Sequence, residues 1–518
     1  MMFNINYTNL IKILVLIIII YPKSSTSKPL SEVQKRGVLK WAADTESGAP
    51  YAFFDPNNLD SLIGFEVDII KEIAKELGVR AEHIQNQWDG LIPGLYRNDY
   101  DVAINGIEIT SDREEVVNFS DWYYITYEQL VVRKDQEGIS NLSDLIGKKV
   151  GTLKASLAER ILNAAGGIIV KTYDSEKNSY TDLELGRLDA VLIDQPVALY
   201  YAGWNKKFKL TGPPIGHITY GIALRKSDTL LLKQINQAIY KIKASGRFRE
   251  IMEYWNLWNF MMANELNDVK VSNFPQTGYL NYINNLKKQF EQDTFWDTFN
   301  KYTGFIPKML EAAWMTIEIS VVSMILAIIL GLFVALSRIY GPKPIQQSAI
   351  IFIELIRGTP LLIQLLFIYY AFPKQLGINL SPFMAAVIGL GVNYSAYEAE
   401  NYRAGIFSVP TGQMEAAISL GMTRLQALRY IILPQAIRVV IPPITNDFIS
   451  LLKDSSLVSV IAMVELTKLY QQLSATYYDY IGIGLMIAAL YLLIGLPFVR
   501  LSRWTEKKFT PGSVTKKN

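Results

Sequence analysis

The apolar residues of this chain are concentrated in its second half. Residues 29 to about 300 mix polar and apolar positions as globular domains do, whereas residues from about 306 to 500 carry repeated apolar runs between short charged stretches. These runs lie at 313–337, 347–372, 381–395, 440–466 and 479–499. Several are long enough for a helix to cross a bilayer, and the shorter third run suits a place inside a bundle. The pattern therefore predicts a globular region followed by five membrane spans.

A shorter apolar block, Ile11 to Ile20, precedes the globular region and is followed by Tyr21, Pro22, Lys23 and a run of Ser and Thr. Because a helix needs about 20 apolar residues to span a bilayer, we expect residues 1–28 to be a signal peptide. The small residues typical of a cleavage site are missing, so an uncleaved N-terminal anchor is the alternative. Either segment would export the region that follows it.

The globular region alternates strands with helices. Strand-like runs lie at 37–43, 101–109, 149–153 and 190–193. After the first of them, Gly64 opens an amphipathic stretch to Ala74, and Gly78 ends the predicted helix. Such alternation is typical of an α/β fold built on a parallel sheet.

Composition excludes several kinds of chemistry. The 518 residues include no cysteine, which rules out disulfides, thiolate catalysis and a lipid-modified N-terminal cysteine. With His83 and His217 as the only histidines, a histidine-rich metal site is not expected. A net charge of +3 says little about partners because the charge is segregated by region. We expect no nucleic-acid partner and no resident metal or cofactor.

Basic residues indicate the orientation of the spans. The C-terminal tail carries Arg500, Arg503, Lys507, Lys508, Lys516 and Lys517. The positive-inside bias places this tail in the cytoplasm, and five crossings then put residue 306 outside. The loop 396–439, which carries Arg403, Arg424, Arg429 and Arg438, falls in the cytoplasm. We therefore expect a multi-pass protein of the cell (inner) membrane, with its globular region outside the cytoplasm.

That loop contains a motif. In the stretch from Gln413 to Gly421, residues Glu415, Ala416, Ala417 and Gly421 resemble the cytoplasmic EAA loop of ABC importer permeases. An ordered series surrounds it: Arg357 to Pro360, Ala396 to Glu400, Met422 to Arg424, Leu433 to Arg438, Pro442, Pro443, Asn446 and Lys453 to Leu457. Over nearly all of 306–500 the chain resembles the polar amino-acid branch of these permeases. A surface helix with a glycine cap is the simpler alternative for the motif alone.

The resemblance implies partners. The EAA helix of such permeases docks on an ABC ATPase subunit, and a permease of this size pairs with a second copy or a paralogue, so a homodimer is expected. The chain lacks a phosphate-binding loop of the form Gly-x-x-x-x-Gly-Lys followed by Ser or Thr. ATP and Mg²⁺ would therefore be used by the partner subunit, and this chain is not expected to be an enzyme.

Two acids follow the third apolar run. Glu398 and Glu400 lie where this run meets the cytoplasmic loop. Acids near membrane depth are costly and often line a substrate path. A solvated helix end, or a pair with Arg403, explains them equally well, so neither is assigned to a site.

The globular region resembles a second family. Gly64 to Ala74 is similar to the signature of family 3 extracellular solute-binding proteins, and the resemblance runs from Gly37 to Trp258. It implies an α/β fold with two lobes that close over an amino acid, with hinge strands at 128–134 and 218–226.

The same resemblance places an amino-acid site. Arg113 occupies the position of the arginine that binds the ligand α-carboxylate in a bidentate fork. Asp194 matches the acid of the second lobe that binds the α-ammonium, Trp88 the aromatic wall, Asp44 the acid near the ligand side chain, and Gly106 the backbone near the carboxylate. The alternatives are a surface arginine paired with Asp112 or Glu114, a helix-capping Asp194 and a core Trp88.

Departures from the family pattern bear on the ligand. Glu108 stands where many relatives have Ser or Thr, Asp89 where a small polar residue is frequent, and Lys154 opens a second-lobe loop without the common Ser-Gly-Thr. Together with Asp44, the extra acids tilt the expectation toward a cationic amino acid such as arginine, lysine or histidine. Glutamine, glutamate or another polar amino acid is the runner-up, since the acids can face away or pair with Lys154.

The predicted organisation is multidomain, with an all-α transmembrane domain after the two-lobed α/β fold. The boundaries are a leader at 1–28, a solute-binding domain at 29–260, a linker at 261–305, a permease domain at 306–505 and a cytoplasmic tail at 506–518. Lobe 1 is expected at about 36–128 and 225–258, and lobe 2 at about 129–224. The linker is Asn-rich and shows no clean period, so we expect a surface tether, with an interfacial helix near 293–305.

Two other functional classes share some of these sequence features. A ligand-gated channel can carry a similar binding fold, but here both lobes are complete before the spans begin and no Thr-Val-Gly-Tyr-Gly filter is present. A periplasmic dehydratase on the binding fold would lose the Arg113 and Asp194 pair. The importer subunit is the favoured prediction.

Overall fold

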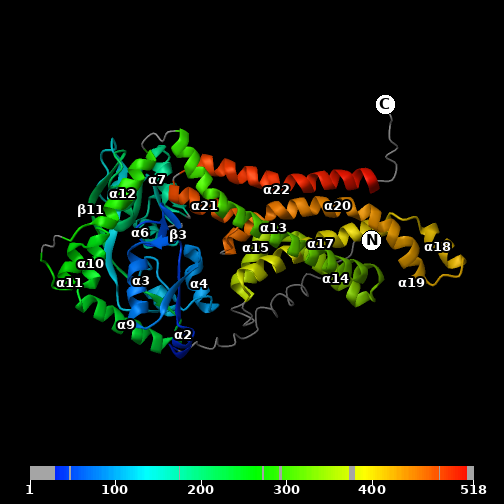
Figure 1. Cartoon of the computed structure of the whole chain (residues 1–518), viewed down its shortest axis with the longest axis horizontal. Helices are drawn as coiled ribbons and strands as arrows, with labels where there is room; N and C mark the ends of the chain where they lie inside the picture. Colours follow the sequence, from blue (N-terminus) through cyan, green and yellow to red (C-terminus); the bar gives the residue numbers. More distant parts are fainter. Residues whose placement is uncertain are drawn as a thin grey trace. The chain divides into compact units, whose positions relative to one another are not determined.

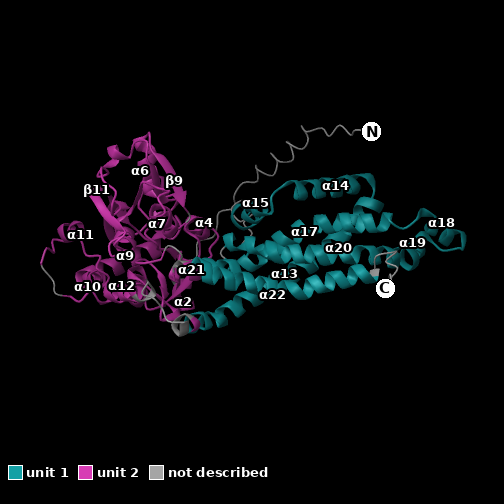
Figure 2. Cartoon of the chain, turned by 90° about the horizontal axis from the view of Figure 1, so that it is seen from above, with its two compact units in different colours: residues 1–23, 300–471, 479–518 teal, residues 24–299, 472–478 magenta. Residues whose placement is uncertain are grey.

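The computed structural model describes residues 30–45, 48–173, 175–270, 274–290, 295–372, 380–461, 463–477 and 479–509. The predicted leader at 1–28 and most of the predicted tail lie outside these residues. The chain forms two compact units, one of residues 24–299 with 472–478 and the other largely of residues 300–471 with 479–518 (Figures 1 and 2). They are called here the α/β unit and the helical unit.

The α/β unit contains two five-stranded sheets. The first has the order β4-β1-β5-β12-β6, from β1 (Val38–Ala43), β4 (Arg80–Gln85), β5 (Val102–Ala103), β6 (Asn118–Phe119) and β12 (Ala223–Leu224). The second has the order β11-β7-β10-β8-β9, from β7 (Tyr124–Arg133), β8 (Lys149–Leu153), β9 (Ile169–Tyr173), β10 (Ala190–Asp194) and β11 (Phe208–Tyr220). In each sheet three neighbouring strands run parallel. The predicted two-lobed α/β architecture is confirmed.

Helices cover both sheets, and a hairpin of β2 (Phe53–Asp55) and β3 (Asn58–Ile63) stands apart. The helices are α2 (Leu30–Arg36), α3 (Phe65–Glu76), α4 (Leu91–Tyr96), α5 (Ser111–Val116), α6 (Leu157–Ala165), α7 (Glu176–Glu184), α8 (Gln195–Tyr201), α9 (Thr229–Ala244), α10 (Arg247–Tyr254), α11 (Phe260–Glu265) and α12 (Thr277–Phe290). In α3, Phe65, Ile69 and Ile73 recur at helical spacing and are buried, which confirms the amphipathic helix predicted after Gly64.

The lobes are joined by β7 and β11. These strands pair antiparallel from Phe208 opposite Arg133 to Tyr220 opposite Tyr124, with register shifts between Thr211 and Ile218. Their inner ends bury Tyr124 and Tyr220 in one core with residues of the first sheet. The predicted hinge strands fall on this ribbon and on the segment that continues into β12.

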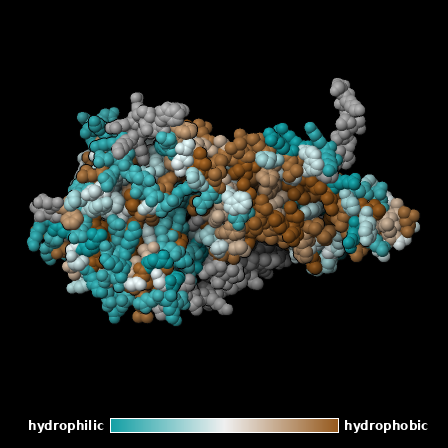
Figure 3. Space-filling view, viewed as in Figure 1, coloured by the Kyte–Doolittle hydropathy of each residue, from teal (hydrophilic) through white to brown (hydrophobic). Residues whose placement is uncertain are grey.

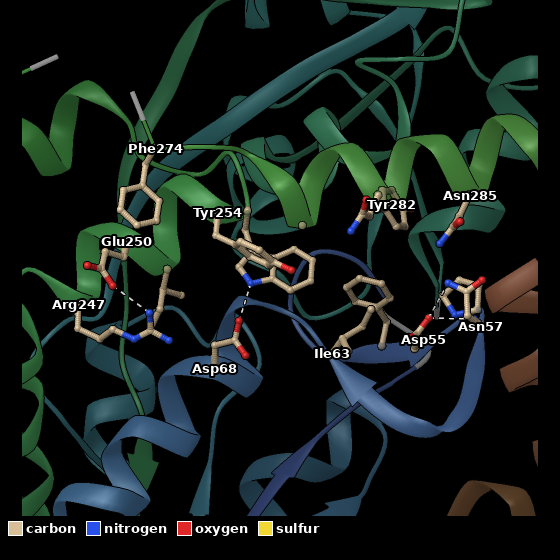
Figure 4. A pocket seen from close by; sticks show the side chains of 16 residues that line it. Asp55, Asn57, Ile63, Asp68, Arg247, Glu250, Tyr254, Phe274, Tyr282 and Asn285 are labelled. Carbon is tan, nitrogen blue, oxygen red and sulfur yellow. Dashed lines mark hydrogen bonds and ion pairs between the residues drawn. The ribbon is translucent and has the colours of Figure 1, made fainter. Parts of the chain in front are cut away.

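The expectation of an aperiodic linker at 261–305 is wrong for α12. Tyr282, Ile283 and Leu286 are buried in the core of the α/β unit, and Tyr279 packs against it. Their spacing is the apolar stripe of an amphipathic helix, which the many Asn residues between them obscured. Figure 4 shows Tyr282 of α12 and the hairpin residue Ile63 at a groove of about 460 Å³ that α10 also lines. The α/β unit thus continues beyond residue 260.

Replacing Leu286 tests this extension. Leu286→Ala removes a side chain that is 2% exposed, so we expect about 3 kcal/mol lower stability of the α/β unit. Leu280→Ala is the matched control, because Leu280 lies on the same helix and is 52% exposed. Thermal unfolding of the full chain measures both. Equal melting temperatures for the two variants would contradict the packing of α12.

The helical unit consists of long helices. They are α13 (Phe295–Tyr340), α14 (Lys343–Gly358), α15 (Leu361–Leu366), α17 (Pro382–Phe407), α18 (Thr411–Ser419), α19 (Arg424–Ala427), α20 (Leu433–Asp454), α21 (Leu466–Tyr477) and α22 (Tyr480–Phe509), with π-helical turns at Phe367–Ala371 and Leu428–Ile432 and a 3-10 turn at Ser455–Ile461. The apolar residues on their outer surface form a broad hydrophobic face (Figure 3).

Among the described residues, three helical stretches are long and apolar enough to cross a membrane: Phe299–Tyr340, Arg424–Ile461 and Tyr480–Lys508. The bent pair of α14 and α15 with its following turn, at 106°, raises the number to four if it is one span. The predicted count of five is therefore not confirmed. The remaining segment, 381–395, lies in α17, which packs against α14, α15 and α20. Because α17 is largely buried by its neighbours, its sequence need not be as apolar as that of a lipid-facing span.

Candidate ligand-binding site

A small cavity lies between the two lobes of the α/β unit. Its volume is about 20 Å³, which is room for about one water molecule, so the lobes are closed on each other. The lining residues are Tyr51, Trp88, Asn105, Gly106, Glu108, Leu153, Ser156, Ala158, Glu176, Ile193, Asp194 and Val197. Four predicted site residues are among them, namely Trp88, Gly106, Glu108 and Asp194.

Arg113 links the lobes at one side of this cavity. Its Nη1 donates to the carbonyl oxygen of Glu108 at 3.1 Å and forms an ion pair with the Glu108 carboxylate. Its Nη2 donates to the carbonyl oxygen of Ala155 in the second lobe at 3.2 Å, and the guanidinium carbon lies 5.5 Å from the centre of the Trp88 ring. The pairing partner is thus Glu108, rather than the Asp112 or Glu114 of the alternative interpretation.

Glu108 is buried and uses both carboxylate oxygens. Oε2 accepts a hydrogen bond from Arg113, and Oε1 accepts from the backbone N–H of Leu157 at 3.1 Å, in the first turn of α6. A guanidinium and a helix N-terminal N–H are the donors that a free carboxylate binds best. The Glu108 side chain therefore occupies a carboxylate-binding position in this closed form.

Asp194 ends β10 on the other side of the cavity. Its carboxyl accepts from the hydroxyl of Tyr51 at 3.2 Å and from that of Tyr220, and the two hydroxyls lie 3.1 Å apart. Glu128 of β7 is its direct cross-strand partner. Burial and the nearby Glu108 charge raise the pKa of Asp194 to about 6, against the lowering effect of the tyrosines. Burial and Asp194 together raise the pKa of Glu128 well above its usual range.

Gly106 has a different environment from the expected one. Its N–H donates to Glu66 Oε1 at 2.6 Å and to the Tyr123 hydroxyl at 3.2 Å, so this N–H is already engaged within the first lobe. Its φ of +62° and the Tyr51 ring, 2.8 Å from where a Cβ would lie, both require glycine. Gly106 thus shapes the cavity wall, and its N–H is not offered to a ligand.

The other predicted residues differ in position. Asp44 follows β1, and its carboxylate accepts from the backbone N–H of Trp88 at 2.9 Å. Its own backbone N–H donates to Asn105 Oδ1 at 2.6 Å. Asp44 therefore positions Trp88, the predicted aromatic wall. Asp89 and Lys154 are exposed and do not line the cavity. They lie beside the residues that do, which is why sequence position alone grouped them with the site.

Four further residues of the site were not predicted from the sequence: Glu176, Glu128, Tyr51 and Tyr220. Glu176 begins α7, where an acid is expected for helix stability alone. Glu128 and Tyr220 lie in strands that were interpreted only as hinges. A glutamate in the middle of the largely apolar and aromatic strand 124–133 was the available signal.

The predicted EAA motif lies on and just after α18 in the helical unit. Gly421 has φ of +86°, its N–H donates to the Ile418 carbonyl at 2.9 Å, and the Met422 N–H donates to the Ala417 carbonyl at 3.1 Å. This is the Schellman pattern, so the predicted glycine-ended helix is confirmed. Ala417 is buried, whereas Glu415 and Ala416 are exposed. Thr423 and Gln426 then form a capping box at α19.

The acids of α17 have separate environments. Glu400 pairs with Arg403 at 2.8 Å and with Arg338, so the predicted pair with Arg403 is present. Glu398 is buried, and the Asn401 amide donates to it at 3.4 Å and to Asp447 at 2.8 Å. These contacts hold α17 to its neighbours.

Comparisons with known proteins follow this division of the chain. Residues 39–257 match the model of bacterial extracellular solute-binding proteins, family 3, and residues 327–511 match that of the binding-protein-dependent transport system inner membrane component. The glutamine transport system permease protein GlnP of Escherichia coli (strain K12) is 36% identical over 42% of this chain and 98% of its own length. The chain belongs to the amino-acid ABC transporters. It joins a binding domain and a permease domain of this family in one polypeptide.

Other relatives match the binding domain of this transporter. The L-cystine-binding protein TcyJ of Escherichia coli (strain K12) is 35% identical over 44% of this chain and 85% of its own length. A solved structure of an ArgBP mutant from T. maritima is 34% identical, covers 44% of this chain and 98% of that one, and has a TM-score of 0.42.

The buried Glu66 predicts a pH dependence of stability. Burial raises the pKa of Glu66 to about 8, against the lowering effect of its bonds from Tyr123 and Gly106. A folded-state pKa above the unfolded value means that the native state binds more protons in between, so this contribution is present at low pH and is lost as the pH rises through about 8. We expect a loss on the order of 3 kcal/mol between about pH 5 and about pH 8.

Glu66→Gln should remove this part of the pH dependence. Thermal unfolding of the full chain across that pH range measures it, and Glu76→Gln at the end of the same helix is the control. The melting temperature of the wild type should fall relative to Glu66→Gln as the pH rises. Parallel curves for the wild type and Glu66→Gln would show that Glu66 does not titrate in this range.

Proposed function

We propose that this chain is the substrate-capturing and membrane-spanning subunit of an ATP-driven amino-acid importer. The observation that carries the proposal is that Asp194 and the aromatic Trp88 line one cavity between the lobes, while Arg113, which contacts the lining residues Trp88 and Glu108, donates across to the second lobe. An α-amino acid needs a cation for its carboxylate, an anion for its ammonium group and apolar walls. A ligand held by both lobes stabilises the closed form by its preference for that form.

Binding would proceed by exchange of partners. The ligand carboxylate takes the position of the Glu108 carboxylate between Arg113 and the first turn of α6, where the donors are already in place. The ligand ammonium group becomes the partner of the Asp194 carboxyl. Burial raises the pKa of Asp194, and a nearby cation lowers it, so the carboxyl ionises when the ligand binds. The lobes must first separate, because the closed cavity of about 20 Å³ does not admit an amino acid.

Translocation would use a separate ABC ATPase subunit with its ATP and Mg²⁺. Glu415 and Ala416 are exposed on α18, and the apolar Leu420 and Leu425 beside it are 84% and 75% exposed. Large apolar side chains exposed next to a rigid short helix suit a protein partner. The motif at Glu415, Ala416, Ala417 and Gly421 is the proposed contact through which the ATPase moves the permease.

The proposed topology places the α/β unit outside the cell (inner) membrane and the 396–439 loop with the C-terminus in the cytoplasm. The basic residues of that loop and tail support this orientation through the positive-inside bias. A second permease copy completes the path, and a homodimer is the simplest assembly. The domain boundaries predicted above stand as proposals, with the binding domain extended to include α12.

The chemical class of the ligand is the most specific part of the proposal. Glu108, Glu176 and Asp194 all line the cavity, which favours a cationic L-amino acid. Asp89 no longer supports that preference because it faces solvent. Glutamine or another polar amino acid is the second candidate, since the named relatives include a glutamine permease and cystine proteins.

Arg113→Ala tests the binding site. Loss of the guanidinium should reduce affinity for every α-amino acid at least about 100-fold, since the α-carboxylate loses its charged partner. Calorimetric titration of the full chain in nanodiscs measures this loss. Arg160→Ala is the control, because Arg160 lies nearby and pairs with Asp112 at 3.6 Å instead. Undiminished binding by Arg113→Ala would refute the carboxylate assignment.

Glu415→Lys tests the coupling helix. The reversed charge on an exposed α18 position should reduce ATP-driven uptake at least about 10-fold by weakening the ATPase contact, while amino-acid binding stays unchanged. Uptake into proteoliposomes and titration measure the two effects. Thr411→Lys, at the exposed first residue of the same helix, should retain uptake. Normal uptake by Glu415→Lys would remove α18 from the coupling route.

A further inference from the structure

Glu176 is a buried acid with no role in the zwitterion clamp. It is the first residue of α7, its side chain lines the cavity between the lobes, and only 3% of the residue is exposed. Its Oε2 atom is fully buried and has no hydrogen-bond partner. A buried carboxyl oxygen without a partner is costly, which points to a partner that arrives with the ligand.

The charges around the cavity do not balance once an amino acid is bound. In the closed form, Glu108 is paired with Arg113, and Asp194 accepts bonds from Tyr51 and Tyr220. In a bound amino-acid zwitterion, the α-carboxylate pairs with Arg113 and the α-ammonium group pairs with Asp194. Glu108 and Glu176 then remain without a cation, and no Lys or Arg is among the described residues that line the cavity.

The electrostatic surroundings of Glu176 agree with a missing cation. Burial, together with Asp44 and Asp194, raises the pKa of Glu176 to about 8, against the lowering effects of its own backbone N–H and of Lys177. A positive group brought next to Glu176 would favour its ionised form, so part of the binding energy of such a ligand would come from this contact.

We propose that Glu176 binds the cationic end of the ligand side chain, and that the ligand is an L-amino acid ending in an ammonium or guanidinium group. This inference rests on the proposed function and names the substrate class of the same site. Two carboxylates, Glu108 and Glu176, then share one delocalised or multiply donating cation. Lysine, ornithine and arginine all carry such a group.

The same charge count disfavours the other ligands. Glutamine is neutral at its side chain and would bring no cation to the buried carboxyl groups of Glu108 and Glu176. Cystine brings a second ammonium group together with a second carboxylate, and among the described lining residues no further cation is present to bind that carboxylate. The net positive charge of the ligand, more than its number of amino groups, is therefore the recognised feature.

Titration of the full chain in nanodiscs with L-lysine, L-arginine, L-glutamine and L-cystine tests the proposal. The wild type should bind lysine or arginine at least about 30-fold more tightly than glutamine or cystine. Glu176→Gln should reduce this preference for the cationic ligand at least about 10-fold and leave glutamine affinity equal or higher. Glu184→Gln is the control, because Glu184 ends the same helix and pairs with Lys207 on the surface.

Several outcomes would overturn the inference. Tighter binding of glutamine or cystine by the wild type would contradict it and leave the importer proposal intact, whereas no binding of any amino acid would contradict the importer proposal itself. An equal loss for all ligands in Glu176→Gln would reveal a purely structural role. Because that variant replaces a buried carboxyl oxygen that has no hydrogen-bond partner, its ligand-free melting temperature should not fall. If it does fall, Glu176→Asp must retain the cationic preference for the proposal to stand.

Discussion

The burial of carboxyl groups between the two lobes is the constraint on which the α/β unit depends. A charge buried without a partner in a protein interior is strongly destabilising. Glu108 forms an ion pair with Arg113 and accepts from the N–H of Leu157, and Asp194 accepts from the hydroxyls of Tyr51 and Tyr220. These contacts join the first sheet to the second, so the chemistry of the cavity also determines how the lobes close. Ligand entry must exchange these partners rather than fill an empty space.

Buried acids in the helical unit also pair with neighbouring polar groups. In hydrocarbon every polar group must be satisfied within the protein, which favours helices and confines acids to the bundle interior. Glu400 lies between Arg338 and Arg403, and the Asn401 amide bridges Glu398 and Asp447. These contacts tie α17 to α13 and α20. A bundle fixed in this way can transmit the displacement of a short surface helix such as α18.

The sequence predicted features that depend on local chemistry. The positive φ at Gly421 follows from a helix that must end in a Schellman turn, and β8 coincides with the predicted strand 149–153. Arg113 and Asp194 were predicted as a pair by family resemblance. Asp194 lines the cavity, whereas Arg113 contacts the lining residues Glu108 and Trp88, and ligand binding by the two stays a prediction.

Features that depend on tertiary packing were missed. The apolar stripe of α12 is interrupted by asparagines, so only its burial against Phe53 and Trp255 distinguishes it from a tether. Glu176 has the appearance of an ordinary helix-starting acid until β8 and β10 enclose it. The predicted count of five spans is not confirmed by length and composition, because α17, which carries the third predicted run, is enclosed by other helices and is not uniformly apolar.

The account holds that one chain both captures the amino acid and conducts it, with energy supplied by a separate ATPase. The most direct test is uptake of labelled L-lysine into proteoliposomes that contain only this chain and its ATPase subunit, with no soluble binding protein added. The account predicts uptake that requires ATP on the side of the ATPase. Uptake that appears only after a separate binding protein is supplied, or that proceeds without ATP, would contradict it.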